Sequence, residues 1–409
     1  MKKITNIALM ILTAAAGTGL LPGCKGAASS LDPRTGEDVS LKRVAAYIRT
    51  TWSIPERLPG YTNWAASQIK GQYLTDLMLA FAVINEKDKT TFSFIDGTDY
   101  SYLWNEIAAL KTAYPHLRIN LSVGGWGADH FSDMAHDPAV RAGFVTNAVQ
   151  FLKDKDLDGI DIDWEYPVGP SWGQQIKSRP EDRANWVSLL RDLRNALDNL
   201  SGETGKRYYL SACVPASSWF LTRNDCAAAA EYVDSLKLMA YDYYGAWTAT
   251  TGHHANLYRN PIDPGGWSTG QSVDAYLKAG VPPEKLMLGL PTYGKEWIDV
   301  TGGLDPKLPG LFSSNFAKDS PGRDIDYHYT IKEYLADKDW TRYWDNAAQA
   351  AFLYNRSIGG WVSYMDGEQI KLISAYAKSK GLGGLFYWEY AWDMEAELLE
   401  IMHRNAMGN

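Results

Sequence analysis

From Leu41 almost to its end, the sequence alternates short apolar segments with longer amphipathic ones. The short segments are rich in β-branched residues, which favours strands, and the longer ones show the spacing of amphipathic helices. Strands separated by helices form parallel βαβ units with right-handed crossovers. Eight segments are expected as strands: 43–49, 76–84, 118–123, 159–166, 208–214, 235–241, 285–290 and 383–388.

Eight such units predict an α/β fold, a (β/α)8 TIM barrel. The competing fold is an open doubly wound sheet, but no GxGxxG fingerprint follows the first expected strand. We therefore predict a barrel formed by residues 41–294 and 365–405.

Residues 295–364 interrupt the alternation between the seventh and eighth strands. This segment is dense in Asp, Gly, Pro, Trp and Tyr and contains short runs with alternating apolar residues. Long insertions at the functional face of a barrel commonly form a wall beside the site. The segment is predicted to be a small α+β insertion domain.

The N-terminus has the pattern of an export signal. Lys2 and Lys3 precede an apolar run over residues 4–21, which is typical of a signal peptide rather than a spanning helix. The segment Leu21-Pro22-Gly23-Cys24 resembles a bacterial lipobox, so residues 1–24 are predicted to be a lipoprotein-type signal and residues 25–40 a linker. We expect a lipid-anchored protein of the cell envelope, with ordinary secretion as the alternative.

Charge and cysteine content narrow the possible partners. The 409 residues carry a formal net charge of -8, which disfavours nucleic acid and anionic membrane surfaces. No Cys and His spacing matches a metal site, so no metal and no cofactor are expected. Cys213 and Cys226 are expected as free thiols, although export leaves a disulfide possible. A monomer is the expected state.

The segment Asp158-Gly-Ile-Asp161-Ile-Asp163-Trp-Glu165 is the strongest signal of function. On a strand its side chains alternate, so Asp161, Asp163 and Glu165 share one face and the apolar residues share the other. A row of buried carboxylates is costly unless the groups are paired or share protons. The spacing does not match an EF-hand calcium loop, and the apolar neighbours argue against a solvated acidic edge.

The order along the strand suits acid/base chemistry on a glycosidic oxygen. Glu165 is outermost and is predicted to be the general acid. The negative charge of Asp163 is expected to raise the pKa of Glu165. Asp161 and Asp163, two like charges on one face, are expected to share a proton.

These residues resemble the Asp-x-x-Asp-x-Asp-x-Glu signature of family 18 glycoside hydrolases, the chitinases. The resemblance covers about residues 43–393, and the insertion resembles the chitinase insertion domain. Further matches lie at the ends of expected strands: Ser122-Val123-Gly124-Gly125-Trp126, Met239-Ala240-Tyr241-Asp242, Pro291-Thr292-Tyr293-Gly294 and Trp388.

The resemblance implies cleavage of β-1,4 linkages in chitin or chitooligosaccharides with retention, the substrate's own N-acetyl oxygen acting as nucleophile. It implies catalytic roles for Glu165, Asp163, Asp161 and Tyr241. Contacts with the sugar are implied for Trp388, Asp242, Tyr293 and Tyr47, with Ser122 and Tyr47 also completing a proton network beneath Asp161. Trp126 and Trp247 follow the third and sixth expected strands, where their rings are expected to stack on sugars of the leaving-group side; the alternative is that they anchor loops on the barrel rim.

One departure and two alternative functions stand beside the resemblance. Lys295 stands where the family often has Arg, and a lysine lacks the bidentate fork of arginine. His253 and His254 are expected at the rim rather than in catalysis. Two other functions stay open, an endo-β-N-acetylglucosaminidase acting on glycoprotein glycans and a non-catalytic chitin-binding lectin.

Overall fold

The computed structural model describes residues 41–50, 63–94, 101–169, 176–319 and 321–408, and the backbone of 52–54 and 58–62. The predicted export signal, the linker and Cys24 lie outside the described residues. Within the described part, no helix combines the length and apolar character that crossing a membrane requires.

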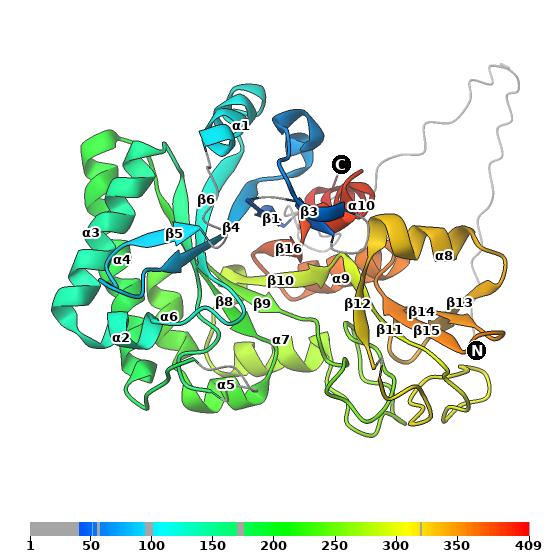
Figure 1. Ribbon diagram of the computed structural model, residues 1–409. Coiled ribbons are helices and arrows are strands. Elements are labelled where there is room, and N and C mark those ends of the chain that lie inside the picture. The colour runs from blue at the N-terminus through cyan, green and yellow to red at the C-terminus, as the bar shows by residue number, and fades with distance from the viewer. Residues whose placement is uncertain are drawn as a thin grey trace, which may run out of the picture.

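Parallel strands form a closed barrel in which β1 pairs with both β4 and β16 (Figure 1). The predicted TIM barrel is therefore confirmed. Its eight strands are β1 (Arg43–Arg49), β4 (Asp76–Ile84), β6 (Arg118–Gly124), β7 (Gly159–Asp163), β8 (Tyr209–Pro215), β9 (Ser235–Met239), β10 (Leu286–Pro291) and β16 (Gly384–Trp388).

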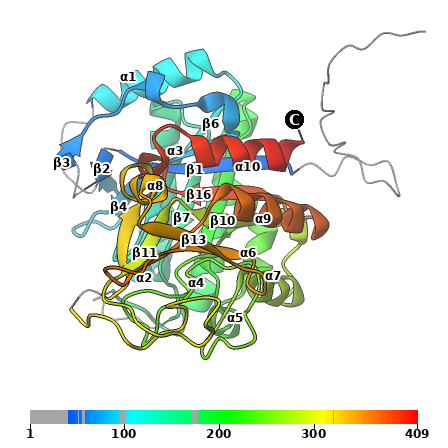
Figure 2. The ribbon, with the colours of Figure 1, turned by 90° about the vertical axis from the view of Figure 1, so that its right-hand side faces the viewer.

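Helices surround the barrel (Figures 1 and 2), and α9 packs beside α10. Local signals fix their starts: the Asp137 carboxylate accepts the N–H groups of Ala139 and Val140 at the start of α3. The helices are α1 (Ser101–Ala113), α2 (Phe131–His136), α3 (Pro138–Asp154), α4 (Asp182–Thr204), α5 (Ser218–Arg223), α6 (Cys226–Tyr232), α7 (Thr269–Lys278), α8 (Lys332–Ala336), α9 (Gly367–Ser379) and α10 (Glu397–Met407).

Successive side chains along β7 point to opposite faces of the strand and so lie in two different environments. Ile160 and Ile162 join the apolar core between the strands and the helices. Asp161 and Asp163 lie on the other face, toward a smaller cluster of side chains that includes Tyr47 and Cys213. The barrel interior is therefore a packed mixture of apolar and charged groups, as the strand pattern predicted.

The segment between β10 and β16 forms a separate antiparallel sheet, so the predicted insertion domain is present. It extends from one side of the barrel (Figure 1) and has apolar clusters of its own. Its strands, in sheet order, are β12 (Arg323–Asp326), β11 (Tyr293–Trp297), β15 (Gly360–Tyr364), β14 (Ala350–Asn355) and β13 (Trp340–Asp345). Short strands elsewhere are β2 (Trp52–Ile54), β3 (Leu58–Thr62) and β5 (Phe92–Phe94).

A buried ion-pair cluster joins the amino-terminal ends of three strands. The fully buried Asp76 of β4 lies 2.8 Å from an Arg43 nitrogen and 2.7 Å from an Arg118 nitrogen. Burial alone would raise the pKa of Asp76, but the two guanidinium groups outweigh it and hold that pKa well below its usual range. The cluster therefore stabilises the fold above the pKa of an unfolded aspartate and loses that contribution as the pH falls.

We predict that Asp76→Asn lowers the free energy of unfolding by about 3 kcal/mol at neutral pH, because two partly buried arginines lose their fully buried charged partner. Urea unfolding followed by tryptophan fluorescence measures the change, and the difference from the unaltered protein should narrow below about pH 4. The matched control is Glu203→Gln, which neutralises an exposed carboxylate 3.8 Å from Lys153 and should cost less than about 0.5 kcal/mol. Equal losses in the two variants would refute this account of Asp76.

Candidate active site

The residues singled out in the sequence gather at the carboxyl-terminal ends of the barrel strands. Glu165 follows β7, Tyr241 and Asp242 follow β9, and Trp388 ends β16. The Tyr241 hydroxyl interacts electrostatically with the carboxyl groups of Asp163, Asp242 and Glu165. The Tyr241 ring centroid lies 6.1 Å from that of Tyr293. The fold thus brings together side chains from distant parts of the chain at one end of the barrel.

Asp161 forms the inner end of the carboxylate row and is fully buried. Its Oδ2 accepts hydrogen bonds from the hydroxyls of Tyr47 at 2.7 Å and Ser122 at 2.8 Å. Its Oδ1 accepts from Ser211 Oγ at 2.5 Å and from Lys237 Nζ at 2.9 Å. The expected network of Tyr47 and Ser122 beneath Asp161 is present, with two further donors.

Lys237 and Ser211 are contacts that the sequence reasoning missed. A signal existed, because Lys237 alternates with Leu236 and Leu238, which places it on the same face of β9 as Met239 and Tyr241. A lysine at an inward position of a barrel strand needs a buried anion. The sequence does not show which one, since that depends on the register between strands.

The inner two carboxyl groups differ in their proton affinity. Burial alone would raise the pKa of Asp161, but the charge of Lys237 and the hydrogen bonds of its neighbours lower it. The pKa of Asp163 is raised well above its usual value by burial and then by the charges of Glu165 and Asp161. These opposite shifts favour Asp163 over Asp161 as the holder of the proton that the two groups are expected to share.

Asp163 also carries an oxygen without a protein partner. Its Oδ1 is buried and has no hydrogen-bond partner among the described residues, whereas the Cys213 thiol hydrogen-bonds the carboxyl group. A buried polar atom of this kind is costly unless a ligand or water satisfies it. The oxygen marks a place where a polar group of a ligand can bind.

Glu165 is 9% exposed, at the outer end of the row. Burial raises its pKa to about 7, a hydrogen bond from Tyr166 opposes that effect, and the charge of Asp242 adds to it. The predicted rise is present, but its causes are burial and Asp242 rather than Asp163. The raised pKa of Asp163 favours its neutral form, which exerts little charge on Glu165.

Asp242 is a charged partly exposed carboxylate with a network of its own. It accepts a hydrogen bond from Tyr293 Oη at 2.8 Å and lies 3.0 Å from Lys295 Nζ. Burial would raise its pKa, but Lys295 and His254 hold it well below its usual range. Asp242 therefore stays negative wherever Glu165 titrates.

The expectation for the two adjacent histidines was wrong. His253 and His254 are buried rather than placed at the rim. His253 Nε2 lies 3.2 Å from Asp345 of the insertion domain, and His254 Nδ1 lies 3.9 Å from Asp242. Both histidines belong to the loop after β9, and each side chain faces one of these two carboxylates.

Trp388 is held from several sides. Its ring stacks on Phe81 with centroids 5.4 Å apart, lies 5.8 Å from that of Tyr47, and has the Arg49 guanidinium 5.5 Å from its centroid. Phe81 and Arg49 were not singled out from the sequence, because an aromatic residue within a strand and an arginine at a strand end are common. The ring of Trp388 is therefore fixed before any ligand binds.

Two tryptophans near the site are strongly exposed. Trp126 follows β6 and is 60% exposed, and Trp247 follows β9 and is 63% exposed. Lys295 Nζ lies 5.1 Å from the centroid of the Trp247 ring, which fixes one side of it by a cation–π contact. Large exposed rings beside a row of carboxylates are suited to stacking on the flat faces of a ligand.

Gly124 permits the close approach of β6 to β7 at the site. Its φ is 122°, and a Cβ atom there would lie 2.0 Å from the Asp163 carbonyl oxygen. That same carbonyl accepts the Gly125 N–H at 2.9 Å. The two glycines therefore fix the backbone at Asp163, and a side chain at Gly124 would displace the carboxylate row.

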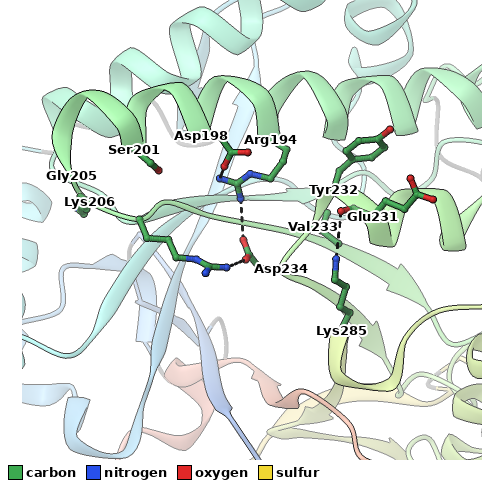
Figure 3. A pocket seen from close by; sticks show the side chains of 11 residues that line it. Arg194, Asp198, Ser201, Gly205, Lys206, Glu231, Tyr232, Val233, Asp234 and Lys285 are labelled. Atoms are coloured by element: carbon green, nitrogen blue, oxygen red, sulfur yellow. Dashed lines mark hydrogen bonds and ion pairs between the residues drawn. The ribbon is translucent and has the colours of Figure 1, made fainter.

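An open hollow lies at the opposite end of the barrel, before β8, β9 and β10 (Figure 3). Its charged groups satisfy one another: Asp234 pairs with Arg194 and Arg207, and Lys285 Nζ donates to the Ala230 carbonyl. Barrel enzymes act at the other end, so this hollow is not the candidate site. Within the described residues, no group of three or more His, Cys, Asp or Glu side chains is arranged to hold a metal ion.

Comparison with known proteins agrees with this geometry. A family model described as Glycosyl hydrolases family 18 matches residues 57–393. The chain belongs to this family. A solved family 18 N-acetylglucosaminidase from Paenibacillus barengoltzii is 32% identical with a TM-score of 0.76, over 89% of this chain and 99% of that one.

Family 18 relatives match most of the chain. Chitinase A1 of Niallia circulans is 35% identical over 302 residues, 72% of this chain and 43% of that protein. Chitotriosidase-1 of Mus musculus is 31% identical over 372 residues, 84% of this chain and 75% of that protein. The chain spans 43% of Chitinase A1 and 55% of a probable endochitinase of Caenorhabditis elegans, about half the length of these two relatives.

We predict that a carboxyl group titrating near pH 7 disappears in Glu165→Gln, and that Asp242→Asn lowers its midpoint by about half a pH unit or more. Removing the nearby negative charge makes ionisation of Glu165 easier. NMR titration of protein labelled with 13C at glutamate carboxyls measures both. Asp324→Asn, which removes the other carboxylate paired with Lys295, serves as the control and should shift the midpoint less. An unchanged midpoint in Asp242→Asn would contradict the assigned cause.

Proposed function

We propose that the protein hydrolyses β-1,4 linkages of chitin or chitooligosaccharides with retention, by substrate-assisted catalysis. The observation that carries the proposal is a buried acid, Glu165 with a pKa near 7, in one row with Asp163, which has an unpartnered oxygen. A carboxyl group that is still protonated near neutral pH can act as a general acid. The names of the relatives support the substrate class.

In the first step Glu165 donates its proton to the glycosidic oxygen while the bond from that oxygen to the anomeric carbon breaks. The acetamido oxygen of the same sugar attacks the anomeric carbon and forms an oxazolinium ion. Asp163 accepts a hydrogen bond from the acetamido N–H with its buried oxygen, and this bond stabilises the positive charge that develops on the oxazolinium ring. The Tyr241 hydroxyl donates to the acetamido oxygen and aligns it, so positioning and electrostatics both lower the barrier.

In the second step water attacks the anomeric carbon from the side that the leaving sugar vacated. Glu165, now a carboxylate, accepts the proton of that water, and the oxazolinium ring opens to restore the acetamido group. Two displacements at one carbon give a product with the β-configuration. Glu165 ends the cycle protonated, ready for the next linkage.

The remaining side chains hold the sugar chain. Trp388 forms an apolar floor under the reacting sugar, and Trp126 and Trp247 stack on the sugars of the leaving-group side. Asp242 and Tyr293 contact the sugar from β9 and β11, while Asp161 supports Asp163 from below. The insertion domain favours a linear polymer over a branched glycoprotein glycan, because a wall beside the site narrows it to a groove.

The similarity to the Paenibacillus N-acetylglucosaminidase, which extends over nearly all of that chain, favours a second candidate. This is the release of single N-acetylglucosamine units from chain ends. The two candidates share the chemistry and differ in the length of the products. Product sizes from a defined oligomer therefore distinguish them.

The sequence alone supports the location that we propose. Lys2, Lys3 and the apolar run after them direct export, and Cys24 carries a lipid that anchors a monomeric enzyme to the cell envelope. Mass spectrometry of the mature N-terminal peptide tests this location. A lipid-free N-terminus would favour ordinary secretion.

We predict that residues 31–409 cleave N-acetylglucosamine hexamer but not cellohexaose, because the latter lacks the acetamido nucleophile, and that β-anomers appear first. Chromatography of fresh products reports their size and anomeric form. Cleavage of cellohexaose, or α-anomers as first products, would overturn the mechanism.

Glu165→Gln should lower the turnover of the hexamer at least about 100-fold, because the amide has no proton to give to the leaving oxygen. Calorimetry should show hexamer affinity within a few-fold of the unaltered protein. The matched control, Glu368→Gln, changes an exposed carboxylate on α9 and should leave turnover unchanged. Comparable turnover in Glu165→Gln would remove Glu165 from the reaction.

Tyr241→Phe should reduce kcat about 100-fold and change KM only a few-fold, because its hydrogen bond strengthens as the oxazolinium ion forms. Steady-state kinetics on the hexamer measure the two constants separately. Tyr243→Phe is the matched control, since Tyr243 lies two residues further on and contacts Ser272 of α7. A rise in KM alone would show that Tyr241 binds substrate without aiding the chemical step.

A further inference from the structure

Lys237 places a fully buried ammonium group in the barrel interior. Its Nζ lies 2.9 Å from Asp161 Oδ1 and 2.8 Å from Ser211 Oγ, and neither Lys237 nor Asp161 is exposed to solvent. Burying two charges costs several kcal/mol per ion, and a well-packed apolar pair is often at least as stable. Stability alone is therefore a weak explanation for this pair.

Asp161 is surrounded by donors from every strand that packs against it. Tyr47 comes from β1, Ser122 from β6, Ser211 and Cys213 from β8, and Lys237 from β9. The acidic group that faces it is Asp163 on its own strand. A proton added to Asp161 would displace one of these donors and leave the buried ammonium without its anion.

We propose that Lys237 is a positioning residue that keeps Asp161 a carboxylate throughout the reaction, so that the exchangeable protons of the row stay on Asp163 and Glu165. The proposal rests on the glycosidase function proposed above. Lys237 touches neither substrate nor the reacting atoms, and it acts through Asp161. Its consequence is that Asp163 cannot pass its proton inward, so the proton remains next to the acetamido group and Glu165.

The charges give the direction of each expected effect. Lys237 and Asp161 together carry no net charge. Removing the positive charge makes every carboxyl group of the row harder to ionise, whereas removing the negative charge makes ionisation easier. Removing both charges should leave the outer two groups close to their original behaviour. A merely structural role for Lys237 predicts no such cancellation.

The test is the pH dependence of kcat/KM for the N-acetylglucosamine hexamer. Lys237→Met should move the acid limb, which reports the inner carboxyl pair, to higher pH by about one unit or more. Asp161→Asn should move that limb to lower pH, and the double variant should return close to the original profile. Ser211→Ala removes a hydrogen bond to Asp161 but no charge, and it should shift the acid limb much less. An acid limb that stays in place in Lys237→Met, or shifts that do not cancel, would overturn the proposal.

Neutron crystallography of the unaltered protein near pH 6 tests the same point without any variant, in case Lys237→Met fails to fold. Deuterium on Asp163 and none on Asp161 is the expected result. Deuterium on Asp161 would overturn the proposal. An unaltered protein that cleaves no hexamer would refute the proposed function instead, and the position of the deuterium would still decide the role of Lys237.

Discussion

The buried carboxylate of Asp161 is the constraint on which the rest of the site depends. An ionised group in the barrel interior needs donors on both oxygens, and four strands besides its own provide them. The requirement links β1, β6, β8 and β9 at one level of the barrel. Because side chains alternate along β7, fixing Asp161 also fixes Asp163 and Glu165 at successive steps toward the mouth.

Proton affinity along this row follows from the partners available at each step. Asp161 has a cation and several donors, so it stays charged. Asp163 is buried and has a thiol donor, an unpartnered oxygen and two acidic neighbours, so its pKa is raised well above the usual value. Glu165 lies near the opening, where burial and Asp242 leave its pKa near 7. One strand thereby presents three carboxyl groups with three different proton affinities.

The sequence predicted the barrel, the insertion domain and the face of β7 that carries the carboxylates, because these depend on local periodicity. It did not predict Lys237 opposite Asp161, since that contact depends on the register of β7, β8 and β9. The same limit explains Phe81 and Arg49 against Trp388. The burial of His253 and His254 was missed because the loop that carries them is covered by the insertion domain, a contact between segments about 90 residues apart.

The insertion domain also reaches the chemistry through Lys295. This residue lies on β11, the first strand of the insertion sheet, and its ammonium contacts both Asp242 and Asp324 beneath the ring of Trp247. An arginine would present a fork able to bind a carboxylate and a sugar together, whereas the buried lysine is a point charge already committed to two carboxylates. Lys295 therefore acts on Asp242 rather than on a sugar. Since the charge of Asp242 helps to set the pKa of Glu165, the insertion domain also influences the pKa of that acid through Lys295.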